Sequence, residues 1–138
     1  MPRTDKQVSY EPRSQYDRNG APYTPETAAT DVEATLKIVE GRWKLRILFH
    51  LFGGGVLRFS ALERAIPGVS QKMLIQQLRQ LENDGVVRRT VHAEVPPRVE
   101  YELTPWGEAL CPALDAILVW AAERERLRQT ASPVLGGG

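Results

Sequence analysis

Cysteine and histidine are scarce in this chain of 138 residues. With one cysteine and two histidines, no internal disulfide can form, and the closely spaced ligands of a zinc site are lacking. The HExxH, CxxC and GxSxG motifs are also missing, and the run Gly53–Gly55 lacks the Lys-Ser/Thr that a phosphate-binding loop requires. We therefore expect no enzyme activity, no catalytic or metal site and no cofactor.

Long apolar runs are missing as well. No stretch approaches the ~18 uncharged residues of a transmembrane helix, and the first twenty residues lack the apolar segment of a secretory signal. Together with the cysteine count, this predicts a cytoplasmic protein with no membrane partner. Hydrophobic residues still make up 42% of the chain, enough for the core of one domain with tails.

The small net charge of +1 conceals an uneven distribution. Residues 1–41 carry 5 basic and 7 acidic side chains, residues 42–98 carry 10 and 4, and residues 99–138 carry 3 and 6. A basic middle between acidic flanks is typical of a domain with one face toward phosphates. Chance clustering of charges is the alternative.

The segment Ser70–Gly85 predicts a helix with Ser70 as its N-cap and Gly85 as its stop. Leu74, Leu78 and Leu81 recur on one side at helical spacing and predict its core face. The opposite side carries residues suited to base edges and phosphates, namely Gln71, Lys72, Gln76, Arg79 and Asn83. The alternative interpretation is the solvated face of an ordinary amphipathic helix.

A shorter predicted helix precedes this one. Ser60 and Glu63 fit a capping box, and Pro67-Gly68 forms a turn directly before Ser70. Two short helices joined by a tight turn form a helix-turn-helix, whose second helix enters the major groove with its N-terminal residues leading. Ser70 and Gln71 would then approach bases, and Ile75 would meet a thymine methyl. Two helices are expected upstream, one capped by Asp31 and one over residues 42–52 in which His50 packs.

Residues 86–103 predict a β-hairpin. Val86–His92 is rich in β-branched residues, and apolar and charged residues alternate from Arg98 to Leu103, with two prolines in the connection. A hairpin directly behind a helix-turn-helix is a wing. We expect Arg89, Arg98 and His92 to reach phosphate or the minor groove. The alternative is a structural hairpin whose arginines are only solvated.

The last helix is predicted to start at Thr104-Pro105 and to bend at Pro112. Its apolar arc is wider than a small domain buries, so it predicts a contact with a second copy of the chain. The residues expected in this contact are Leu110, Leu114, Ile117, Leu118, Trp120 and Ala121. Cys111 is expected to be a small packing residue.

Residues 30–122 closely resemble the HxlR-type winged-helix transcription regulators of bacteria, relatives of the MarR group. The resemblance rests on GRWKLRILFHL, LRFSALERAIPGVSQKML, LRQLENDGVVRR and VPPRVEYELTPWGEAL. It implies a homodimer that is bridged by terminal helices and binds operator DNA. It also implies DNA contacts from Ser70–Arg79, from the wing near Pro97 and Arg98, and from Arg58 to the backbone.

The sequence departs from this family at one position. Many members have a cysteine just before the first helix, and some use it to sense oxidants or electrophiles. Thr30 stands there in this chain, so redox sensing through that position is not available. Any small-molecule effector is unknown.

These observations predict a mainly α fold with a small β-hairpin (α+β), a winged helix-turn-helix with terminal dimerisation helices. A disordered arm is expected over 1–27, the winged domain with its dimerisation helix over 28–128, and a flexible tail over 129–138. The expected function is a sequence-specific regulator that binds double-stranded DNA as a homodimer on an inverted-repeat operator. Helix 70–84 would enter the major groove, and wing 86–104 would lie on the backbone or minor groove. The alternative is a winged-helix protein-interaction module without DNA readout.

Overall fold

The computed structural model describes residues 14–131, which fall into two compact units that meet between Ile38 and Val39. Residues 1–13 of the expected arm and residues 132–138 of the expected tail lie outside the described part. The domain boundaries expected at 27/28 and 128/129 stay predictions. Each unit is described by itself below.

In the described part of the first unit, residues 14–38, helix α2 (Pro25–Leu36) follows a turn closed by a β-bridge between Tyr16 and Pro22. Thr24 caps the helix, and its hydroxyl accepts the backbone N–H of Thr27 at 3.1 Å. The start expected at Asp31 is therefore wrong. Thr24-Pro25 supplies the earlier signal, because proline suits the first helical position, where its missing N–H costs nothing. Val32 and Leu36, on the apolar side of α2, are exposed.

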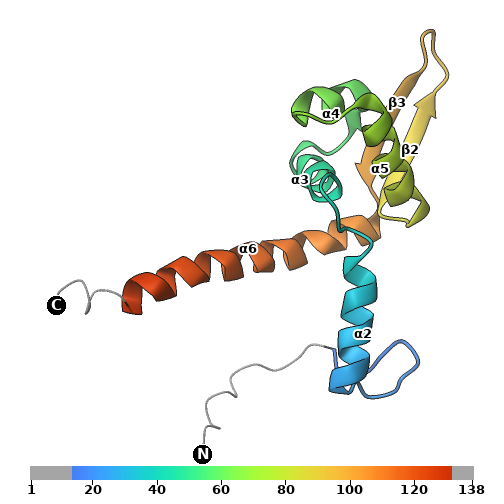
Figure 1. Cartoon of the computed structure of the whole chain (residues 1–138). Coiled ribbons are helices and arrows are strands. Elements are labelled where there is room, and N and C mark those ends of the chain that lie inside the picture. Colours follow the sequence, from blue (N-terminus) through green and yellow to red (C-terminus); the bar gives the residue numbers. More distant parts are fainter. Residues whose placement is uncertain (1–13, 132–138) are drawn as a thin grey trace, which may run out of the picture. The chain divides into compact units, whose positions relative to one another are not determined.

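The second unit places helices against a small antiparallel sheet (Figure 1). Its elements are α3 (Lys44–Gly54), β1 (Leu57–Arg58), α4 (Phe59–Ala65), α5 (Gln71–Asn83), β2 (Val87–His92), β3 (Arg98–Leu103) and α6 (Pro105–Ala131). The strand order is β1-β3-β2. The most deeply buried side chains come from α3, α4, the C-cap residue of α4, α5 and β2, and include Ile47, Leu48, Leu51, Leu62, Ile66, Leu74, Leu78, Leu81 and Val87. The expected fold class, a winged helix-turn-helix, is confirmed.

The helix-turn-helix consists of α4, a short turn and α5. The hydroxyl of Ser70 accepts the backbone N–H of Met73 at 3.0 Å, and Gly85 takes a left-handed φ of 81° just after α5. Both ends of the helix predicted from the sequence are thus confirmed. Its three leucines are almost completely buried, so the opposite side is left at the surface.

The capping box expected at Ser60 is wrong. Helix α4 begins at Phe59, with Arg58 at the N-cap position and no side-chain cap. Arg58 belongs to β1, which pairs with β3 opposite Glu100. Because the chain enters the helix straight from this strand, Ser60 already lies in the first turn. His50, which we expected to pack, is also exposed, because α3 turns Ile47 and Leu51 inward.

The predicted hairpin is confirmed as β2 and β3, paired from Val87–Leu103 at its base to His92–Arg98 near its tip. The two prolines lie in the connection over residues 93–97, where no ladder hydrogen bond is needed. The hairpin extends beyond the helices of this unit (Figure 1). Its outer half is therefore open to a partner.

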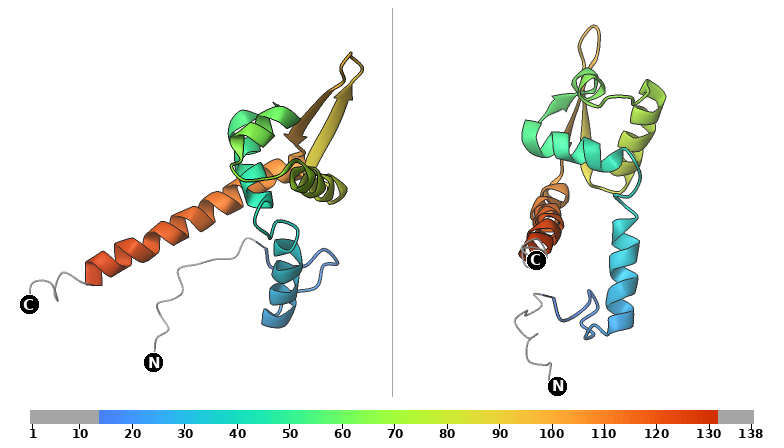
Figure 2. Two further views of the ribbon diagram at one scale, coloured as in Figure 1. Left: turned by 45° about the horizontal axis from the view of Figure 1, so that its top comes forward. Right: turned by 60° about the vertical axis from the view of Figure 1, so that its left-hand side comes forward.

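Helix α6 is joined to the end of α5 by Thr104. The Thr104 hydroxyl donates to the carbonyl oxygen of Gly85 at 2.6 Å and accepts the backbone N–H of Gly107 at 3.1 Å. A Cβ at Gly107 would stand 2.2 Å from the carbonyl oxygen of Val86, so only glycine fits there. From this joint α6 runs for 27 residues, through Pro112, away from the rest of the unit (Figure 2).

Only a narrow side of α6 is buried, consisting of Gly107 and Leu114. Cys111 falls outside it and is exposed, so its expected role as a packing residue is wrong. Within residues 14–131 no helix is both long enough and apolar enough to cross a lipid bilayer.

Candidate nucleic-acid interface

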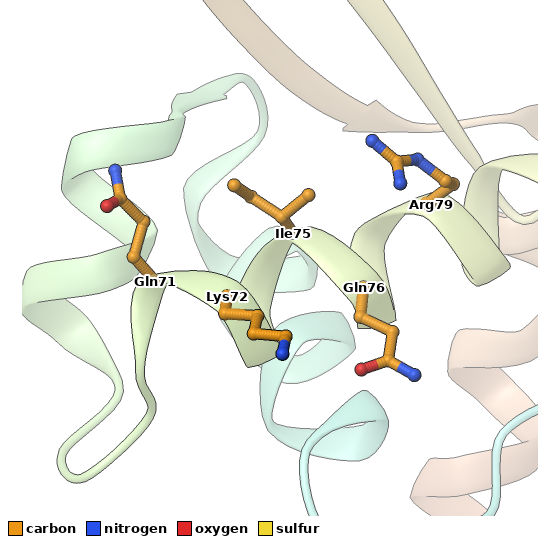
Figure 3. Close-up of a pocket in the computed structure, with 5 residues that line it drawn as sticks. All are labelled: Gln71, Lys72, Ile75, Gln76 and Arg79. Carbon is orange, nitrogen blue, oxygen red and sulfur yellow. The ribbon is translucent and has the colours of Figure 1, made fainter.

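The outward face of α5 forms an open hollow of about 610 Å³. Five of the residues expected in the interface line it, namely Gln71, Lys72, Ile75, Gln76 and Arg79. Figure 3 shows them along two edges of the helix. Gln71, Ile75 and Arg79 follow the edge that turns toward the strands, and Lys72 and Gln76 follow the other. The sequence pattern thus placed these side chains on one surface.

The cations of this hollow have no counter-ion within the described part of the chain. No carboxylate there lies within 4.0 Å of the Lys72 ammonium or the Arg79 guanidinium. The acid closest to them on α5, Glu82, instead pairs with Arg89 on β2 at 3.4 Å. The hollow therefore presents positive charge and an exposed amide, Gln76, to a partner. This combination suits phosphates and base edges.

A second depression, a cleft of about 400 Å³, lies between α5 and the sheet. Arg79 and Arg89 line it together with Tyr101, which is only 7% exposed. Burial raises the pKa of the Tyr101 phenol, although nearby Arg89 opposes the shift. Tyr101 therefore stays protonated at neutral pH, and its hydroxyl remains a donor beside two guanidinium groups.

Tyr101 is the member of this cleft that sequence reasoning missed. The alternation of apolar and charged residues in β3 predicts that Tyr101 is buried, and the structure agrees. That pattern gives no information about where the Tyr101 hydroxyl lies. The usable signal is the strand register, in which Tyr101 stands directly opposite Arg89. That register depends on contacts between strands and is not visible in the sequence of β3 alone.

Arg98 and His92 on the wing contact acids of the wing itself. The Arg98 guanidinium lies 3.1 Å from a carboxylate oxygen of Glu94 and 3.5 Å from one of Glu100, and Glu100 also contacts the His92 ring at 2.8 Å. Arg98 is only 28% exposed, and its Nε is buried without a hydrogen bond among the described residues. Its contact with Glu100 is thus a charge interaction without hydrogen-bond geometry. The wing holds the expected cations but has little free positive charge.

Three further residues expected at the interface lie around this surface. Ser70 uses its hydroxyl to cap α5. Arg58 is exposed on β1, across the ladder from Glu100, and Pro97 is exposed in the hairpin connection. None of the three lines the hollow on α5.

The residues expected to pair two chains differ widely in exposure. Ile117, Leu118 and Trp120 are 48%, 54% and 75% exposed, and Ala121 is exposed beside them. Leu114, in contrast, is only 7% exposed and Leu110 is half-buried. Leu114 therefore packs within its own chain, and the apolar surface available to a partner starts beyond it.

Comparison with known proteins gives a consistent result. A family model described as HxlR-like helix-turn-helix matches residues 38–129. The chain is 52% identical over 91 residues to an uncharacterized HTH-type transcriptional regulator, YtcD of Bacillus subtilis, covering 66% of this chain and 71% of that one. It is 46% identical over 89 residues to another from Methanothermobacter thermautotrophicus, covering 64% and 67%. A MarR-family transcriptional regulator from Enterococcus faecalis V583 superposes with a TM-score of 0.69 at 38% identity, over 74% and 92% of the two chains.

Proposed function

The chain belongs to the HxlR-like helix-turn-helix family, and from this premise we propose that it controls transcription as a homodimer on an inverted-repeat operator. Its relatives are named transcriptional regulators, not enzymes. In this proposal α5 reads bases in the major groove, and the β2–β3 wing lies on the backbone or minor groove. The site of action is the cytoplasm.

One observation carries the proposal: the outward face of α5 combines exposed amides with cations that have no counter-ion among the described residues. Lys72 and Arg79 supply charge for phosphates or guanine, and Gln76 can make a bidentate contact with adenine. A helix that docks onto a protein would instead show apolar anchors at these positions. Ile75, 38% exposed, is the single large apolar side chain among them, and its size suits a thymine methyl.

The surroundings of α5 would supply backbone contacts. Arg89 and the Tyr101 hydroxyl border the cleft beside α5, where a phosphate can accept donors from both. Arg58 on β1, and Pro97 and Arg98 at the wing, would follow the sugar–phosphate chain further out. Arg98 must first give up its carboxylate partners, so we assign it a smaller share of the affinity than Lys72 or Arg79.

The exposed apolar part of α6 supports the homodimer. Ile117, Leu118 and Trp120 lie close together along α6, and all three side chains are exposed in the described unit. An isologous contact between two such helices removes this surface from water in both chains. The two copies of α5 would then lie about 34 Å apart, matching half-sites one helical turn apart.

Base readout can be tested by selecting binding sites from a randomised duplex library with the wild-type protein and with Gln76→Ala. We expect the variant to lose about 1–3 kcal/mol at one base position, because a bidentate adenine contact is removed. Binding to random duplex should be unchanged. Gln80→Ala is a matched control, because Gln80 belongs to the same helix but does not line the hollow.

The proposal fails if Gln71, Gln76 and Arg79 each tolerate alanine with no change in the selected sequence. It also fails if duplex binding by the wild-type protein does not weaken as salt rises, because phosphate contacts release counter-ions. The second result would favour a protein-interaction module.

A further inference from the structure

A group of cations at the start of α3 has no place in the interface described so far. The Arg42 guanidinium carbon lies 4.4 Å from the centre of the Trp43 ring, and that of Arg46 lies 5.9 Å from it. Arg46 also donates a hydrogen bond to the Arg42 carbonyl oxygen. The indole and this bond therefore hold both arginines near one place.

Within the part of the chain that the structure describes, these charges have no counter-ion. No carboxylate among residues 14–131 lies within 4.0 Å of Arg42, Arg46 or Lys44, which follows Trp43. Lys44 is only 8% exposed, and the first turn of α3 contains no acid. Because a helix N-terminus carries partial positive charge, three cations here repel one another and the helix dipole. An anion would relieve that repulsion.

Trp43 places this group of cations next to the helix-turn-helix. Its ring lies 3.8 Å from where a Cβ of Gly68 would stand, and Gly68 is in the turn that leads into α5. Helix α3 packs against α5, and Figure 3 shows the α3 ribbon passing α5 on the edge that carries Lys72 and Gln76. The wing and its cleft lie toward the other edge.

We propose that Arg42 and Arg46, held against Trp43, form a second phosphate-binding site on the side of α5 opposite the wing. The inference rests on the proposed DNA binding and extends it. A helix in the major groove has a phosphate chain on either side of it. The cleft with Arg79 and Arg89 faces one chain, and the arginines at Trp43 face the other. Because both guanidinium groups are already oriented by the indole, little conformational freedom is lost when they bind.

The test is a salt titration of binding to random-sequence duplex with the Arg42→Gln/Arg46→Gln double variant. One phosphate contact contributes about 0.9 to the slope of log K against log salt, so loss of this single site should lower the slope by about 0.9 for each protomer bound. At a given salt concentration, the double variant should lose affinity for the selected operator and for random duplex by the same factor. Its preferred sequence should not change. Arg64→Gln/Arg124→Gln removes two exposed arginines from α4 and α6 as the matched control and should leave the slope unchanged.

A lysine double variant separates the effect of charge from that of structure. Arg42→Lys/Arg46→Lys keeps both charges and should retain most of the salt slope. If the slope is lost with this variant, the positive charges are not responsible for the binding. Circular dichroism should show that all variants fold. An unchanged slope in the glutamine double variant overturns this inference alone, provided that Lys72→Gln still weakens binding. If wild type itself does not bind duplex, the proposed function fails as well.

Discussion

The carboxylates of the wing should limit DNA binding, and Glu100 is the residue on which this can be measured. Its two oxygens face the Arg98 guanidinium at 3.5 Å and the His92 ring at 2.8 Å. Glu94 faces Arg98 from the other side at 3.1 Å. A phosphate that approaches Arg98 must compete with both acids and is repelled by them. Glu100→Gln removes one negative charge and keeps the shape of the side chain.

The size of the effect follows from these contacts. Partly exposed ion pairs contribute up to about 1 kcal/mol each, and Glu100 is 24% exposed. Removing its charge should tighten binding to random duplex by up to about fivefold at 0.1 M salt. The slope of log K against log salt should become steeper by up to about 0.9 for each protomer. Arg98→Ala should weaken binding, but by less than Lys72→Ala, because no carboxylate among residues 14–131 competes for the Lys72 ammonium.

The measurement is fluorescence anisotropy of a labelled duplex over a series of salt concentrations. Glu125→Gln is the matched control, because it removes a carboxylate paired with Arg128 at 3.8 Å on α6 and changes the net charge equally. In an Arg98→Ala background, Glu100→Gln should increase the affinity for duplex by a smaller factor, because no guanidinium is released. Weaker binding by folded Glu100→Gln would refute this reasoning and show that Glu100 positions Arg98 for contact instead.

Three other predictions concern stability and assembly. Leu78→Ala should lower the free energy of unfolding by about 2–5 kcal/mol in denaturant titrations, because it leaves a cavity at a side chain that is 1% exposed; a loss under 1 kcal/mol would contradict the packing described. Gly107→Ala should destabilise by about 1–3 kcal/mol in the same assay, because its Cβ would stand 2.2 Å from the Val86 carbonyl oxygen; an unchanged midpoint would mean that α6 moves freely at this joint. Ile117→Glu should convert a dimer into a species of the monomer mass of 15.5 kDa in light scattering, with Gln129→Glu as the exposed control on the same helix; a wild-type protein of monomer mass at micromolar concentration would exclude the dimer.

The parts of the fold that depend on local signals could be predicted from the sequence. Helix α5 has a serine cap, a glycine stop and three leucines at helical spacing, all within one short segment, so both its bounds and its exposed face follow from it. The hairpin can likewise be predicted from the alternation of apolar and charged residues in β3 and from the two prolines in its connection. The start of α4 could not be derived in this way, because it depends on the pairing of Arg58 with Glu100 about forty residues later.

The candidate site shows the same division. The residues expected on α5 lie on one surface, because one helix carries them all. The ion pairs of Arg98 were missed because cations alone were counted, although Glu100 lies two residues further along the same strand, on the same side. The arginines at Trp43 were not predicted, because the sequence around them carries no signal of a binding site. Their position beside the turn before α5 depends on packing between distant segments.

The hydrogen bond from Thr104 to Gly85 links the start of α6 to the end of α5. Because this bond joins the residue before α6 to a residue just after α5, we expect a rotation of α6 to be passed on to α5. Ile117 lies thirteen residues beyond Thr104, about 20 Å along the helix. In a dimer held at Ile117, a 10° change in the angle of α6 would move this joint by about 3.5 Å, the rise of one base pair. Anything that alters the crossing of the paired helices, even by a few degrees, would therefore shift α5 out of register with its half-site.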